Sequence, residues 1–223
     1  MTRGWPIGAL LLAALCLSAG PGMARDPLWE LLPWNERLGV DWYEHRGVRG
    51  DAEAQALAGA MHERGIGTPV DRAQALHWYR MAAENGQPAA QFRLGVLLGQ
   101  ISPPDHAAAA QWFRAAAEGG IAPAAYNLAV LHETGQGVAA DETEAARLYE
   151  QAFRDGLPQA ALNRALLALR ASPPDAASAY LWLLRAQDAG VAAAEGLVAE
   201  VAPLLSDEQR QAAEIAARES QAR

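Results

Sequence analysis

The strongest constraint on the fold is a segment that returns four times along the chain. Each copy begins with Asp, carries a bulky apolar residue seven positions later and ends with Gly. The copies begin at Asp71, Asp105, Asp141 and Asp175, with spacings of 34, 36 and 34 residues. The bulky column holds Trp78, Trp112, Leu148 and Trp182, and the terminal column holds Gly86, Gly120, Gly156 and Gly190. Three columns in one register indicate a repeat protein whose units bury their apolar faces against one another.

Each unit predicts a pair of helices. The shared Asp is suited to accept hydrogen bonds from the free N–H groups at the start of the second helix. The shared Gly is suited to the left-handed conformation that ends this helix, and the apolar residue after it completes a Schellman-type cap. A column of small residues leaves room for close helix packing: Gly39, Ala75, Ala109, Ala145 and Ala179. The predicted fold class is all-α, a solenoid of helix pairs that forms an α-α superhelix.

The repeat register divides the chain into parts. The solenoid is predicted over residues 35–205: a half repeat at 35–50, repeats at about 51–86, 87–120, 121–156 and 157–190, and a further first helix at 192–205. Ser206 and Gln209 form a capping box that predicts a polar C-terminal capping helix within 206–223. Residues 25–34 are predicted to cover the other end, because an exposed apolar end of a solenoid would aggregate.

The units differ in the loop inside the helix pair. The loops GIGTPVD and GQGVAAD of units one and three alternate with the shorter ISPPD and ASPPD of units two and four. This alternation indicates duplication of a block of two repeats.

Residues 1–24 predict a secretory signal peptide. Arg3 precedes an apolar run from Trp5 to about Ala19, and small residues flank a cleavage site at Ala24. The run is shorter than a membrane-spanning helix needs, so we expect no membrane span after cleavage, although an uncleaved anchor is the alternative.

The only cysteine, Cys16, lies in this segment, and the mature chain is therefore expected to fold without disulfides. The missing Lys and abundant Ala, Arg and Gly suggest a GC-rich bacterium, which places the protein in a Gram-negative bacterial envelope, periplasmic or secreted.

Composition excludes several chemistries. All 18 basic residues are Arg, so no Lys can form a Schiff base or a P-loop contact. The formal charge is −8 and the Arg residues are scattered, which argues against nucleic acid as a partner. No Ser, His and acid set stands in a recognisable motif. We therefore expect neither an enzyme nor a cofactor.

The segment from Leu128 to Gly156 combines a GxG loop, a capping Asp, a small-residue column and a terminal Gly. This pattern resembles the Sel-one-like repeat family, relatives of the tetratricopeptide repeat, over roughly residues 35 to 205. The resemblance implies a right-handed superhelix whose concave face binds partner proteins or peptides, commonly in bacterial envelope signalling and assembly. Units two and four depart from the pattern by losing the GxG loop, and Arg164 replaces the family's usual Leu. Some similar secreted members, described as β-lactamase-like, have a disulfide in each repeat, and this chain lacks those cysteines.

One position of the first helix recurs along the predicted concave wall and holds Leu57, Arg93, Asn127 and Asn163. Asn or Arg there could hydrogen-bond a peptide backbone or a carboxylate. In similar tetratricopeptide repeats an Asn at this position contacts bound peptide. The predicted protein-binding residues are thus Arg93, Asn127, Asn163 and Tyr126, and the alternative is a solvated polar face. Replacing the three polar residues of this position by Ala is expected to abolish binding without changing thermal stability.

Two other patterns are interpreted as structural. His62-Glu63 and His132-Glu133 lack the second His four residues on that a zinc helix needs, so no metal site is expected. The Trp column recurs with the structural unit, and we therefore predict that it is core.

These features predict a non-enzymatic adaptor, scaffold or regulator of an envelope process that holds a protein or peptide in its concave groove. One alternative is a cell-wall or β-lactam-directed hydrolase, suggested only by the family resemblance and the compartment. Another is a structural subunit of a secretion or polysaccharide machine. The sequence leaves the oligomeric state open.

Overall fold

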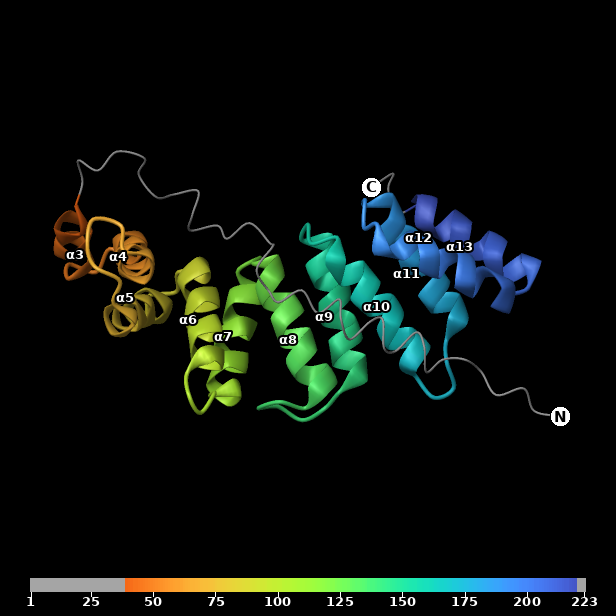
Figure 1. Cartoon of the computed structure of the whole chain (residues 1–223), viewed down its shortest axis with the longest axis horizontal. Coiled ribbons are helices and arrows are strands. Elements are labelled where there is room, and N and C mark those ends of the chain that lie inside the picture. Colours follow the sequence, from red (N-terminus) through yellow and green to blue (C-terminus); the bar gives the residue numbers. More distant parts are fainter. Residues whose placement is uncertain (1–38, 220–223) are drawn as a thin grey trace.

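Helices alone build the part of the chain that the structure describes. The computed structural model describes residues 39–219, so the predicted signal peptide at 1–24, the cover at 25–34 and the start of the half repeat lie outside the described residues. The helices are α3 (Val40–Gly47), α4 (Ala52–Arg64), α5 (Arg72–Glu84), α6 (Pro88–Gln100), α7 (His106–Glu118), α8 (Ala122–Thr134), α9 (Glu142–Arg154), α10 (Gln159–Arg170), α11 (Ala176–Asp188), α12 (Ala193–Val201), the 3₁₀ helix η1 (Ala202–Leu204) and α13 (Asp207–Glu219). They stack along the long axis of the molecule, with α3 and α13 at opposite ends (Figure 1). The predicted all-α solenoid is confirmed.

The second helix of each unit begins and ends as predicted. The capping Asp accepts backbone N–H groups two or three residues ahead at 2.9–3.0 Å in all four units. The four terminal glycines have φ of +78° to +95°. After each of them the next N–H donates to the carbonyl five residues back, again at 2.9–3.0 Å. These local caps stop α5, α7, α9 and α11 at 13 residues each, which keeps the units in register.

The predicted packing columns form the core, with exceptions in the half repeat. The alanines of the small column are at most 1% exposed, and Trp78, Leu148 and Trp182 of the bulky column are buried, while Trp112 is partly buried. In the half repeat, α3 has only 8 residues, and Gly39 lies at its exposed N-cap rather than in a helix interface. Trp42 is 41% exposed, with the Arg46 guanidinium 5.0 Å from its ring.

The two loop forms differ in backbone conformation. Each long loop has two glycines with positive φ, whereas each short loop contains a cis Ser–Pro peptide. Gly137 of the third unit lies against the start of α7 in the second unit. A Cβ at Gly137 would stand 2.3 Å from the His106 carbonyl carbon and 2.4 Å from the Ala107 nitrogen. The long loop of unit three therefore docks backbone to backbone on unit two.

The C-terminal end is capped by α13, which packs against α11. Ser206 and Gln209 make both hydrogen bonds of the predicted capping box, at 3.0 and 3.2 Å. The helix before it, α12, ends at Val201 and continues as η1, in whose first turn Pro203 lies. It is thus shorter than the predicted 192–205, because Pro cannot donate the N–H that an α-helix requires.

Candidate functional site

Two polar contacts join first helices of neighbouring units. Arg93 of α6 forms an ion pair with Glu63 of α4. Asn163 of α10 donates from Nδ2 to the Tyr126 hydroxyl of α8 at 2.8 Å. Helices α4, α6, α8 and α10 are the first helices of the four units, and we call them together the first-helix wall.

A buried Tyr–Glu hydrogen bond lies beneath this wall in units one and three. Tyr79 donates to Glu63 Oε2 at 2.8 Å, and Tyr149 donates to Glu133 Oε2 at 2.7 Å. Both tyrosines are fully buried. Burial and the adjacent carboxylate raise the pKa of each phenol far above its ordinary value. Both hydroxyls therefore remain protonated donors.

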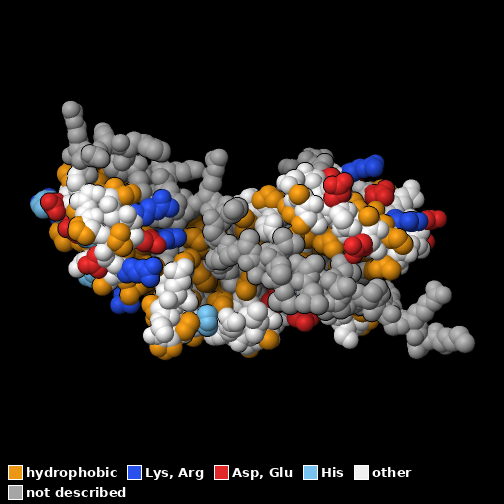
Figure 2. All heavy atoms as spheres, in the orientation of Figure 1, with side chains coloured by type: hydrophobic (Ala, Val, Ile, Leu, Met, Phe, Trp, Pro, Cys, Tyr) orange, Lys and Arg blue, Asp and Glu red, His pale blue; other side chains and the backbone are white. Residues whose placement is uncertain are grey.

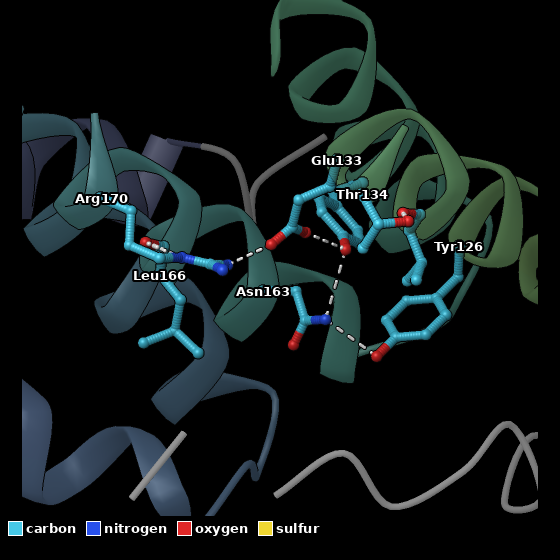
Figure 3. A network of polar contacts seen from close by, with 8 residues as sticks. Tyr126, Glu133, Thr134, Asn163, Leu166 and Arg170 are labelled. Carbon is cyan, nitrogen blue, oxygen red and sulfur yellow. Dashed lines mark hydrogen bonds and ion pairs between the residues drawn. The ribbon is translucent and has the colours of Figure 1, made fainter. Parts of the chain in front are cut away.

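The third unit extends its pair into a network across α8, α9 and α10 (Figure 3). The Asn163 amide nitrogen lies 2.8 Å from the Tyr126 hydroxyl and 3.5 Å from the Tyr149 hydroxyl. Figure 3 shows the Asn163 and Tyr126 side chains pointing toward each other. The other oxygen of Glu133 forms an ion pair with Arg170. In the first unit the corresponding cation is Arg93. Arg93 and Asn163, which hold the same repeat position, are thus both joined to a buried Tyr–Glu pair.

Asn127 holds the same repeat position in unit three, but it is not joined to a Tyr–Glu pair. Its side chain is partly buried and makes no hydrogen bond to any residue that the structure describes. The reason lies one unit earlier, where Phe92 and Phe113 occupy the positions of Tyr126 and Tyr149, whose hydroxyls contact Asn163. Phenylalanine has no hydroxyl, so the Asn127 amide keeps its donors and its acceptor available.

The four residues of the predicted binding position therefore have different surroundings. Leu57 is buried in the core, Arg93 and Asn163 are joined to the buried pairs, and Asn127 is available. The Arg93–Glu63 ion pair changes the expectation that replacing all three polar residues leaves thermal stability unchanged. We expect the triple replacement to lower stability, because it leaves Glu63, whose side chain is only 18% exposed, without its ion-pair partner. Tyr126 is available only in part, since its hydroxyl already accepts from Asn163 and its ring contacts Tyr149.

The Tyr–Glu pairs were not identified from the sequence. Their signal was the recurrence of both residues in units one and three, where the even units have Gly99 with Phe113 and Leu169 with Leu183. The pairs thus follow the same alternation as the loops.

The two histidines of the repeated His-Glu dipeptide are buried. His62 Nε2 lies 2.7 Å from Glu44 Oε1, which also accepts from Trp78 Nε1 at 3.2 Å, so this histidine ties α4 to the half repeat. The ring nitrogens of His132 have no partner among the described residues. Within residues 39–219, no three metal-ligating side chains gather in one place.

Acidic and basic side chains are interspersed on the face shown in Figure 2, mainly toward its two ends. None of the described helices has both the length and the apolar character that crossing a membrane requires.

These observations define the class of protein: a helical-repeat solenoid with capped helix pairs and a wall of first helices. More particularly, the chain belongs to the Sel1 repeat family, whose model matches residues 52–87, 88–121, 122–157 and 158–191. Sel1 repeats are in general non-catalytic modules that bind other proteins.

Two solved structures share this fold. A protective antigen of uropathogenic Escherichia coli with an SLR fold is 26% identical and superposes with a TM-score of 0.69, over 81% of this chain and 40% of that one. A Sel1 repeat protein from Oxalobacter formigenes is 25% identical, with a TM-score of 0.65 over 74% of this chain and 75% of that one.

Two fungal proteins share part of the repeat sequence. A chitin synthase regulator of Malassezia restricta is 36% identical over 69 residues, which is 31% of this chain. A chitin synthase regulatory factor of Schizosaccharomyces pombe is 39% identical over 64 residues, which is 29% of this chain. The matched segments are only 5% and 7% of those proteins' length.

Proposed function

We propose that this protein is a non-enzymatic adaptor or regulator of an envelope process, periplasmic or secreted, that binds an extended segment of a partner protein on the first-helix wall. The observation that carries the proposal is that the Asn127 amide makes no hydrogen bond to any described residue, whereas Arg93 and Asn163 at the same repeat position bond to other residues of the chain. A side-chain amide has both donors and an acceptor, so it can pair with the N–H and the carbonyl of an extended peptide backbone. Asn127 would therefore anchor the partner.

Two further observations support the proposal. Sel1 repeats generally bind proteins, and the two fungal relatives are named as a regulator and a regulatory factor, which favours a regulatory partner interaction over a permanent structural one. The signal peptide predicted at 1–24 supports the envelope location.

Replacing Asn127 by Ala is expected to weaken partner binding about tenfold, which corresponds to the loss of one or two hydrogen bonds. The melting temperature should not fall, because the amide bonds to no described residue and Ala is the better helix former. The measurement is affinity capture from the native envelope, followed by titration of the captured partner against the purified variant.

The matched control is Gln111→Ala, which removes an exposed side-chain amide from a second helix, away from the first-helix wall. Equal affinities of the partner for the Asn127→Ala and Gln111→Ala proteins would refute the proposed site. A partner that binds both variants less well than the wild type would place the contact elsewhere on the solenoid.

A further inference from the structure

The fourth unit carries a charged residue at a position where units two and three have Leu and unit one has Ala58. Arg164 holds the repeat position of Leu94 and Leu128, which are at most 1% exposed. The Arg164 side chain is 16% exposed, and its Nε donates to Glu150 Oε1 of α9 at 3.0 Å. A guanidinium has thus replaced an aliphatic side chain at the junction of α9, α10 and α11.

A second guanidinium lies beside it. Arg185 of α11 places its Cζ 4.4 Å from the centroid of the Trp182 ring, and the Cζ of Arg164 is 5.9 Å from the same ring. Trp182 is buried, and the Phe153 ring packs edge to face against it at 5.7 Å. The indole is therefore a rigid platform that orients both arginines.

The two positive charges share one carboxylate. Among residues 39–219, Arg185 forms no ion pair, and its buried Nε has no acceptor. Burial lowers the pKa of Arg185, and Glu150 alone acts in the opposite direction. This surplus of positive charge stands in a chain whose formal charge is −8, so carboxylates are plentiful elsewhere. An unpaired, partly desolvated guanidinium costs stability, and such a cost is typical of a group that awaits a ligand.

We propose that Arg185 and Arg164, held on Trp182, form a binding site for a carboxylate side chain of an acidic partner peptide. Glu150 keeps Arg164 in place, while Arg185 offers its N–H groups to the incoming carboxylate in the fork geometry that guanidinium and carboxylate share. The proposal goes beyond the function proposed above: Arg185 and Trp182 belong to a second helix, whereas Asn127 belongs to the first-helix wall.

The probe is a fluorescently labelled, terminally blocked peptide of six glutamates, titrated with the full-length protein at low salt and followed by fluorescence anisotropy. A peptide of six glutamines is the neutral control. We expect the wild type to bind the glutamate peptide selectively and Arg185→Gln to bind it about tenfold more weakly, the size of one charge-assisted hydrogen bond. No selective binding by the wild type overturns the proposal.

Arg154→Gln is the matched control variant, because it removes one positive charge from an exposed position of α9. Both variants change the net charge by the same amount, so the long-range attraction to the peptide falls equally in the two. Because Arg154 is not part of the proposed site, Arg154→Gln should retain an affinity within about twofold of the wild type. Equal losses in Arg154→Gln and Arg185→Gln would show only general charge attraction and overturn the site. Asn127→Ala should bind the glutamate peptide like the wild type, which separates this proposal from the preceding one.

Thermal denaturation distinguishes a ligand site from a purely structural role. The melting temperature of Arg185→Gln should lie within about 3 °C of that of the wild type. The substitution loses the contact of the guanidinium with the Trp182 ring, but it also removes a partly buried charge that has no ion-pair partner among the described residues. The glutamate peptide should raise the melting temperature of the wild type and leave that of Arg185→Gln unchanged. A large fall in the melting temperature of Arg185→Gln, with no selective loss of peptide affinity, would assign Arg185 to the fold alone.

Discussion

Replacing Gly137 by Ala is expected to lower the free energy of unfolding by about 3 kcal/mol. Two effects add: an L-residue is strained at the observed φ of +70°, and the new Cβ would meet backbone atoms of His106 and Ala107 at 2.3–2.4 Å. Backbone atoms at the start of α7 cannot move away from the new Cβ as the end of a flexible side chain could. Urea denaturation followed by circular dichroism measures the change.

Gly67 of the first unit provides the matched control. Its φ is +69°, nearly identical, but a Cβ there would meet nothing closer than Met61 Cε at 3.6 Å. Gly67→Ala should therefore cost only the conformational part, about 1 kcal/mol. If the two variants lose equal stability, the close approach of the long loop to α7 does not contribute to the cost of Gly137→Ala. The positive φ alone would then account for that cost.

The second large effect concerns the Tyr149–Glu133 pair. Glu133→Leu leaves the fully buried Tyr149 hydroxyl without its acceptor and should cost roughly 2–3 kcal/mol. Tyr149→Phe should cost about 1.5 kcal/mol, because it removes one hydrogen bond to a charged group. Each loss reflects an unsatisfied partner rather than lost packing.

The double variant should lose less than the sum of the single losses, by on the order of 1–2 kcal/mol. The even units already show that apolar residues fit both positions, with Leu169 and Leu183 in unit four. Denaturation of the wild type, both single variants and the double variant completes the cycle. Strictly additive losses would mean that the two side chains do not act as a pair, contrary to the 2.7 Å contact.

The fold was predictable from the sequence to the extent that its signals are local. A capping Asp acts on N–H groups two or three residues away, and a C-terminal Gly acts through its own φ, so both can be recognised in a single segment. Repetition then amplified these weak signals, because the same residue types recurred at the same spacing. Helix order, the ends of the second helices and the core columns of the four full units followed from them.

The candidate site was predictable only as a column of positions. Asn127 and Asn163 are the same residue at the same place in their helices, yet Asn163 bonds to Tyr126 while Asn127 bonds to no described residue. The difference comes from the preceding unit, which has Tyr126 and Tyr149 in one case and Phe92 and Phe113 in the other. No feature of the residue itself distinguishes the two.

The sequence by itself determined the repeat length, the helix pairs, their caps and membership of a protein-binding repeat class, because each depends on residues a few positions apart. The tertiary structure alone decided which polar side chains are joined and which are available: Arg93 to Glu63, two guanidiniums on one indole at Trp182, and Asn127 without a bond to any described residue. The physical reason is that a hydrogen bond or an ion pair needs its partner within about 3 Å. In a solenoid that partner comes from the neighbouring unit, and only the packing of one unit on the next brings the two together.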